Sequence, residues 1–192
     1  MQILTIYKKG FTLVEALVAI AILLLVIIGP MTIAQKGIQN ARYAREQMTA
    51  IFLAQEAIEG VRQIRDEIGL RVYTGDEPTL DTTEWIQNAH EMCGSGCAFV
   101  VGDYSAQLSL CSGASGCKLY IDSDTGDYTH TEAGNYESPY TRVITIGAPD
   151  AINNSVPVNV EVSWYGQVFK STRTVFLQTW IYDHYERYEG NI

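Results

Sequence analysis

One carboxylate near the start of the chain lies where a charge is costly. Glu15 follows the basic pair Lys8-Lys9 and Gly10, and it precedes an apolar run, Ala16 to Gly29, that contains no charged residue. An ionised side chain at the centre of a membrane helix costs about 2.5 to 3.5 kcal/mol on insertion scales. We therefore expect Glu15 to have a function, and pairing with an opposite charge is the chemistry open to it.

Two ordinary kinds of membrane-directed segment leave Glu15 unexplained. A secretory signal has basic residues before an apolar stretch, but that stretch is usually shorter, and Thr32-Ile33-Ala34 makes a poor cleavage site. A plain single-pass anchor accounts for the length, because the 24 residues from Phe11 to Ala34 exceed the roughly 20 that span a bilayer. Lys8-Lys9 would then hold the start of the chain in the cytoplasm.

A third interpretation rests on the run Gly-Phe-Thr-Leu-Val-Glu from Gly10 to Glu15, which follows a short basic leader. This run resembles the cleavage and methylation motif of type IV prepilins and pseudopilins. The resemblance implies that a prepilin peptidase cuts after Gly10 on the cytoplasmic side and that the new amino group of Phe11 is N-methylated. It also implies assembly with other pilin or pseudopilin subunits at an assembly platform.

The new amino group and Glu15 have a physical reason to pair between neighbouring subunits. Both charges are unfavourable in lipid alone, and the Phe11 ammonium of one subunit would neutralise the Glu15 carboxylate of another. Removing one partner of a buried ion pair costs about 3 to 5 kcal/mol, because it leaves a charge without its counterion. Such pairing would fix the stagger between subunits.

The four cysteines form two closely spaced pairs, Cys93 with Cys97 and Cys111 with Cys117. They follow the apolar segment, so they lie outside the cytoplasm if that segment spans a membrane, and disulfides are plausible there. Residues 98–110 are typical of a hairpin, which would place Cys97 opposite Cys111. Nested bridges fit as well as two local ones, and we favour the nested pairing. A zinc knuckle is the rival, but gaps of three and five residues depart from the usual zinc spacing.

Other residues offer little chemistry. Asp122, Asp124 and Asp127 surround a glycine and suggest a weak calcium site, but the spacing fits an EF-hand loop poorly, and a hairpin turn with solvated acids is favoured. The three histidines are far apart, and the sequence has neither a recognisable nucleophile setting nor a glycine-rich phosphate loop. We therefore expect a protein that is not an enzyme and needs no cofactor.

The charge balance argues against general nucleic-acid binding. The chain has 13 Lys and Arg against 22 Asp and Glu, a formal net charge of -9, and such a surface repels phosphate backbones. A small basic patch around Lys36, Arg42 and Arg45 is the local exception that the sequence leaves open.

A long helix is expected to connect the membrane segment to the rest of the chain. A proline kink or a melted turn is expected at Pro30. Past it, apolar residues recur every three or four positions and form a predicted stripe: Ile38, Ala41, Ala44, Met48, Ile51, Ala54, Ile58, Val61, Ile64 and Ile68. A continuous helix from Phe11 to about Ile68 would be roughly 87 Å long. Residues 70–90 are expected to form an irregular connector.

The second half of the chain is expected to form an antiparallel sheet. Residues 156–164 alternate between apolar and other side chains, with Pro157 suggesting an edge, and residues 141–146 and 168–181 supply two more strands. The resemblance implies the same α+β, pilin-like fold, a long N-terminal helix kinked near Pro30 and packed on the sheet. The predicted segments are a leader (1–10), a transmembrane and filament-core helix (11–34), an amphipathic helix (35–68) and a β domain with a cysteine-containing hairpin (69–192).

The function implied is that of a structural subunit, a minor pilin or I-type pseudopilin of a type IV pilus or a type II secretion-like filament. It would first be a single-pass membrane protein with its N-terminus in the cytoplasm, and later part of a cell-surface or periplasmic filament. The alternative is a membrane-anchored extracellular binding module that never polymerises.

Overall fold

The structure, a computed structural model, describes residues 10–74, 82–99, 108–111, 116–150, 152, 154–166, 168 and 170–182. The chain divides into two compact units, Met1–Ala44 and Arg45–Ile192. Lys8-Lys9 and the end of the chain after Tyr182 lie outside the described residues.

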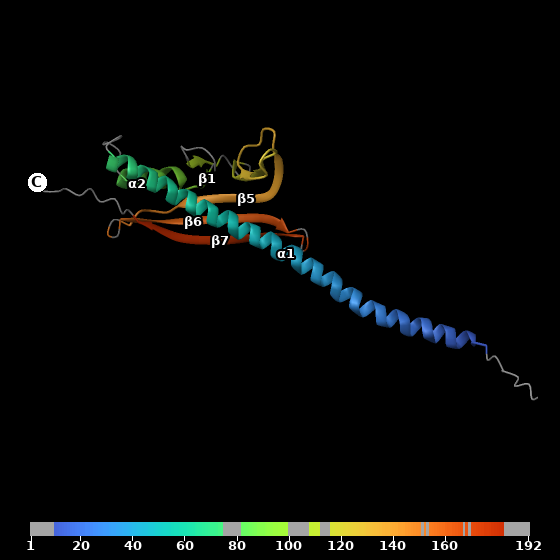
Figure 1. The fold of residues 1–192 in the computed structure, drawn as a ribbon. Coiled ribbons are helices and arrows are strands. Elements are labelled where there is room, and N and C mark those ends of the chain that lie inside the picture. Colours follow the sequence, from blue (N-terminus) through green and yellow to red (C-terminus); the bar gives the residue numbers. More distant parts are fainter. Residues whose placement is uncertain are drawn as a thin grey trace, which may run out of the picture. The chain divides into compact units, whose positions relative to one another are not determined.

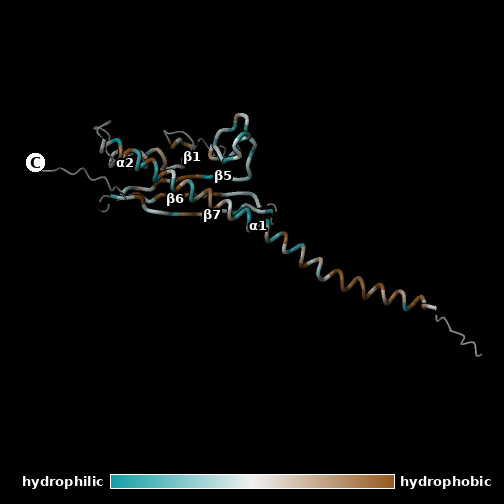
Figure 2. Tube along the Cα trace, viewed as in Figure 1, coloured by the Kyte–Doolittle hydropathy of each residue, from teal (hydrophilic) through white to brown (hydrophobic). Residues whose placement is uncertain are grey.

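Helix α1 (Leu13–Thr74) is longer than the predicted helix and includes Pro30 in its interior. The melted turn expected at Pro30 is not present, and the Thr32 hydroxyl donates a hydrogen bond to the Gly29 carbonyl at 2.8 Å there. The kink near Pro30 stays a prediction. Figure 2 shows predominantly hydrophobic colouring over the first part of this helix.

The part of α1 within the second unit has one buried face. Ala54, Ile58, Val61 and Ile64 belong both to the predicted apolar stripe and to the observed core. Met48 was predicted in this stripe, but it is 56% exposed. The helix has 3.6 residues per turn, so residues chosen at fixed steps of three and four gradually drift off its buried face. The observed core of the helix also includes Ala50, Leu53 and Ala57.

Helix α2 (Thr82–Cys93) occupies residues 82–90 of the segment that was predicted to be irregular, and α1 takes up residues 70–74 of it. The prediction of a connector was therefore wrong for these residues. Trp85, Ala89 and Cys93 recur at four-residue steps, and the structure buries Ala89 and Cys93 completely or nearly so. The threonines and acids near these residues made the helical spacing hard to recognise in the sequence.

The sheet is centred on three long antiparallel strands, β5 (Tyr136–Ile146), β6 (Ser155–Gly166) and β7 (Ser171–Tyr182). Seven residue pairs join β5 to β6 and twelve join β6 to β7, which confirms the predicted meander (Figure 1). The α+β, pilin-like architecture is thus a long helix packed against a curled antiparallel sheet. The helix residues that cover the sheet follow Ala44 and belong to the same unit as the strands.

Four short strands complete the sheet: β1 (Cys97–Phe99), β2 (Leu108–Leu110), β3 (Lys118–Ile121) and β4 (Tyr128–Thr129). The edge of β5 that faces away from β6 is shared, because β3 pairs with its first half and β1 with Ile144. Strand β2 pairs with β1, and β4 pairs with β3, each in antiparallel orientation.

Pro157 does not mark an edge strand, because β6 lies between β5 and β7. In an antiparallel ladder the N–H and C=O of one residue point to the same neighbour. The Pro157 carbonyl accepts a hydrogen bond from Gly147 N–H at 2.8 Å, just beyond the end of β5 at Ile146. The missing amide hydrogen would therefore point towards Gly147, beyond the last residue of β5, so proline costs only a bond at the very end of the ladder.

Candidate processing and assembly site, and the centre of the second unit

The residues proposed for processing lie at the exposed start of helix α1. Gly10, Phe11 and Thr12 precede the first helical residue, and the Phe11 side chain is 78% exposed. A β-carbon built on Gly10 would meet no atom within 4 Å. The peptide bond between Gly10 and Phe11 is therefore outside the helix and sterically open.

Thr12 caps the helix. Its side-chain oxygen accepts a hydrogen bond from Glu15 N–H at 3.2 Å, and its carbonyl accepts one from Ala16 N–H at 3.1 Å. Thr and Glu at this three-residue spacing are the residues of a capping box, in which the threonine satisfies an amide that has no partner inside the helix. Sequence reasoning missed this role of Thr12, although the Thr-x-x-Glu spacing is visible in the printed chain.

Glu15 occupies the first turn of α1, where the partial positive charge of the helix end favours an acid. Its side chain is exposed, and the described residues place no cation within ion-pair distance of it. The apolar residues that follow are exposed as well, including Leu17, Leu24 and Ile28. The most apolar 18-residue window of the helix has a mean hydropathy of 2.8 and no buried residue, which fits a single-pass membrane anchor.

The second unit contains a fully buried cation, Arg142 on β5. One guanidinium nitrogen, Nη1, donates to the Leu53 carbonyl at 3.2 Å and to Glu56 Oε2 at 2.9 Å. The other, Nη2, donates to the Phe99 carbonyl at 3.2 Å and lies 3.5 Å from His130 Nε2. Burial lowers the pKa of Arg142, and the Glu56 carboxylate opposes that shift. Arg142 thus joins α1, β1 and the segment after β4 to the centre of the sheet.

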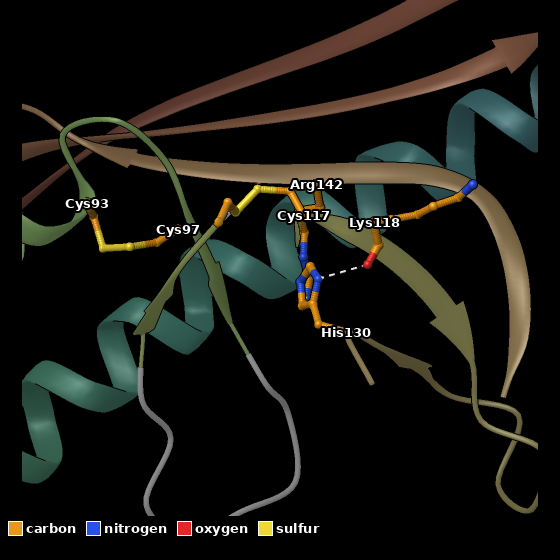
Figure 3. The surroundings of a disulfide bond; sticks show 7 residues. Cys93, Cys97, Cys117, Lys118, His130 and Arg142 are labelled. Atoms are coloured by element: carbon orange, nitrogen blue, oxygen red, sulfur yellow. Dashed lines mark hydrogen bonds between the residues drawn. A yellow bond between two sulfur atoms is a disulfide. The ribbon is translucent and has the colours of Figure 1, made fainter. Parts of the chain in front are cut away.

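His130 beside Arg142 is held in its neutral form. Its Nδ1–H donates to the Lys118 carbonyl at 3.0 Å, which leaves Nε2 to accept from Arg142 (Figure 3). Burial, and secondarily the charge of Arg142, lowers the pKa of His130 to about 4, whereas the bond to Lys118 opposes this shift. His130 is therefore part of the packing and would not serve as a base with a pKa near neutrality.

Two aromatic side chains hold Glu46 near the start of the second unit. Tyr140 Oη donates to the Glu46 carbonyl and Trp164 Nε1 donates to Glu46 Oε2, each at 3.2 Å. The two rings lie 6.1 Å apart. They therefore fix one turn of α1 over strands β5 and β6 by hydrogen bonds as well as by apolar contact.

The cysteines form two local disulfides, Cys93–Cys97 and Cys111–Cys117, so the favoured nested pairing was wrong. Strands β1 and β2 pair Cys97 with Leu110 rather than with Cys111, one residue away from the predicted register. A shift of one residue turns a side chain to the other face of a strand. Figure 3 shows the two bridges lying apart, with Cys117 near Arg142.

The acids proposed as a weak calcium site form a turn between β3 and β4. Asp122 Oδ1 accepts the backbone N–H groups of Asp124 and Thr125, each at 2.9 Å, and Asp122 N–H donates to the Asp127 carbonyl. These bonds to Thr125 and Asp124 lower the pKa of Asp122. Gly126, with a φ of 79°, supplies the left-handed residue of the turn. In the part of the chain that the structure describes, no group of three His, Cys, Asp or Glu residues is placed to hold a metal ion.

Comparison with known families supports the interpretation of the N-terminal segment. Residues 7–29 match the model of the prokaryotic N-terminal methylation motif. No curated protein and no solved structure matches the chain significantly. The match covers the proposed cleavage position, Glu15 and the whole apolar run from Ala16 to Gly29.

Proposed function

The methylation motif is consistent with a type IV prepilin or pseudopilin family protein, and from this premise we propose that the chain is a structural subunit of a filament. The filament would be a type IV pilus or a type II secretion-like pseudopilus, with this chain as a minor component. The motif points to a structural protein rather than an enzyme. It carries the proposal, because it joins a cleavage position, a methylated residue and an apolar helix in one segment.

We propose the following order of events. Prepilin peptidase cuts between Gly10 and Phe11, the new amino group is methylated, and the helix stays in the membrane until the subunit enters the filament. The sterically accessible peptide bond between Gly10 and Phe11 supports the cleavage step. The exposed apolar helix supports storage in a membrane. The second unit would then lie on the extracytoplasmic side, where its two disulfides are stable.

Glu15 would pair with the Phe11 ammonium of a neighbouring subunit during assembly. Two observations make this proposal testable: the carboxylate is exposed, and it follows the proposed new terminus by four residues. A non-polymerising membrane anchor is the second candidate, favoured by the capping geometry. Thr12 and the helix start give Glu15 a local role that needs no neighbouring subunit.

Replacing Glu15 separates these two candidates. We expect Glu15→Leu to leave the protein in the membrane fraction and to reduce its amount in sheared filaments at least tenfold, because the Phe11 ammonium loses its counterion. Glu15→Asp, which keeps the charge, serves as the matched control and should retain more of the incorporation. Equal filament content for Glu15→Leu and the unchanged chain would refute the pairing role of Glu15, whereas absence of the unchanged chain from sheared filaments would support the non-polymerising anchor.

Mass spectrometry of the mature N-terminus tests the processing step directly. The proposal requires a chain that begins at N-methylated Phe11. A chain that retains its first ten residues, or that begins near Ala34, would refute it.

A further inference from the structure

The sheet face that points away from α1 carries a cavity of about 380 Å³ at one end of the long strands. Its walls include Lys118 of β3, Glu137 and Thr141 of β5, Ser163 and Tyr165 of β6, and Thr172 of β7. Side chains alternate between faces along a strand. Since Tyr140, Arg142 and Trp164 contact α1, the side chains of Thr141, Ser163 and Tyr165 lie on the opposite face.

The cavity offers hydroxyl groups in a row. The strand register places Lys118 beside Thr141, Thr141 beside Ser163, and Tyr165 beside Thr172. Within the described part of the chain, the side chains of Thr141, Ser163 and Thr172 have no hydrogen-bond partner. Each hydroxyl can both donate and accept, so the row suits a ligand that carries many hydroxyls.

The cavity is close to electrically neutral. Lys118 Nζ forms an ion pair with Glu137 Oε1 at its wall, so the cation already has a counterion. A phosphate or carboxylate ligand would have to compete with Glu137 for Lys118. The charge arrangement therefore favours an uncharged ligand, for which the ion pair supplies further donors and acceptors.

Aromatic rings continue from the cavity along the same sheet face. Tyr165 is 54% exposed, and Phe176 and Trp180 of β7, which are 59% and 47% exposed, lie four and eight residues beyond Thr172. At about 3.4 Å per residue the row from Thr172 to Trp180 is about 27 Å long. Polar side chains of both strands lie between the rings: Ser163, Thr174, Asn159, Gln178 and the exposed carboxylate of Glu161. Glu161 pairs with Phe176 across the strands and would repel an acidic polymer.

From this arrangement we propose that the outer sheet face binds a neutral polysaccharide, with one sugar unit in the cavity. A pyranose ring has an apolar C–H face that packs on an aromatic side chain and hydroxyls at its rim that fit the Thr and Ser row. Phe176 and Trp180 contact sugar units farther along the same chain. The ligand class is thus an uncharged polysaccharide of several units, and binding is independent of whether the protein polymerises.

The test uses the full-length chain in a detergent without a sugar head group, because alkyl glycosides would compete for the site. Affinity electrophoresis against neutral xylan, dextran and laminarin, with polygalacturonate as the acidic comparison, measures retardation of the folded protein. We expect at least one neutral polymer to retard the chain and polygalacturonate to do so less. Absence of retardation by all three neutral polymers, or equal retardation by the acidic one, would overturn the proposal.

Substitutions locate the binding on the sheet face. We expect Tyr165→Ala to weaken retardation at least tenfold and the double change Thr141→Val with Ser163→Ala to weaken it at least threefold. Tyr136→Ala removes an exposed tyrosine that does not line the cavity, so it should leave retardation within twofold. The near-ultraviolet circular dichroism of each variant shows that it is folded. Unchanged binding by folded Tyr165→Ala would refute the assignment of the cavity.

Discussion

Arg142 combines complete burial with hydrogen bonds to three separate parts of the second unit. We expect Arg142→Ala to lower the free energy of unfolding by about 3 to 5 kcal/mol, because Glu56 and the carbonyl of Phe99 lose their partner. Urea unfolding of the full chain in detergent measures this loss. Arg62→Ala is the matched control, since its exposed pair with Glu59 contributes less than about 1 kcal/mol. Equal losses for the two variants would contradict the role of Arg142.

His130 makes the stability of the second unit depend on pH. Its pKa is about 4 in the fold and about 6.5 in an unfolded chain, so between these values only the unfolded chain binds the proton. Stability is complete above about pH 6.5 and falls as the pH drops towards 4, by about 2 kcal/mol once solvent screening of the half-buried ring is allowed for.

The variant His130→Gln, which cannot titrate, tests this dependence. Urea unfolding at pH 7 and at pH 4.5 should show a smaller difference for the variant than for the unchanged chain. An identical difference would mean that other groups, the carboxylates among them, cause the loss at low pH.

The residues proposed for processing belong to a short, local motif, so the sequence alone is enough to propose them. Gly10, Phe11 and Glu15 are recognised by type and spacing alone. Arg142, Glu56 and His130 could not be joined in this way, since they come from distant segments that only the fold brings together. One signal was present: Arg142 stands at an inward position of the alternation Tyr140, Arg142, Ile144.

Helix α1 packs closely against Phe99 of strand β1 at Gly60. A β-carbon there would lie 2.4 Å from the Phe99 ring, so the glycine is required by packing. We expect Gly60→Ala to lower the free energy of unfolding by about 1 to 3 kcal/mol, although alanine is the better helix former by about 1 kcal/mol. Thermal unfolding followed by circular dichroism measures the change.

Gly37→Ala is the comparison for this helix. Gly37 is also interior to α1, but no atom lies within 4 Å of the position of its β-carbon. We expect this variant to keep the melting temperature of the unchanged chain or to exceed it. A loss as large as that of Gly60→Ala would contradict the role of the Phe99 contact, because alanine favours the helix at both positions.

The helices and strands in which apolar residues recur regularly over many positions were predictable from the sequence. The short elements that form only through contact with other parts of the fold were not. The long helix and strands β5 to β7 follow from apolar spacing over many residues. Helix α2 was missed because Thr82 and Glu84 hide a short apolar repeat. The two-residue strand β4 has no pattern of its own and exists through pairing with β3.

For the molecule as a whole, the two short disulfide loops give a specific chemical expectation. Chymotryptic cleavage at Phe99 and Tyr104 under non-reducing conditions should leave Cys93 with Cys97 on one fragment and Cys111 with Cys117 on another. Peptides joined across Phe99 in mass spectrometry would show nested bridges instead. Replacing one pair by alanines should cost about 2 kcal/mol, the value expected for loops this short.

Both bridges join cysteines that are neighbours along the chain, four and six positions apart. A segment leaving the membrane N-terminus first would therefore expose each pair almost together, before strands β5 to β7 emerge. Oxidation can then proceed in the order of synthesis, with the first pair closed before the second becomes available. If the second unit is exported as proposed, the chain would need an oxidant during export but little disulfide isomerase afterwards.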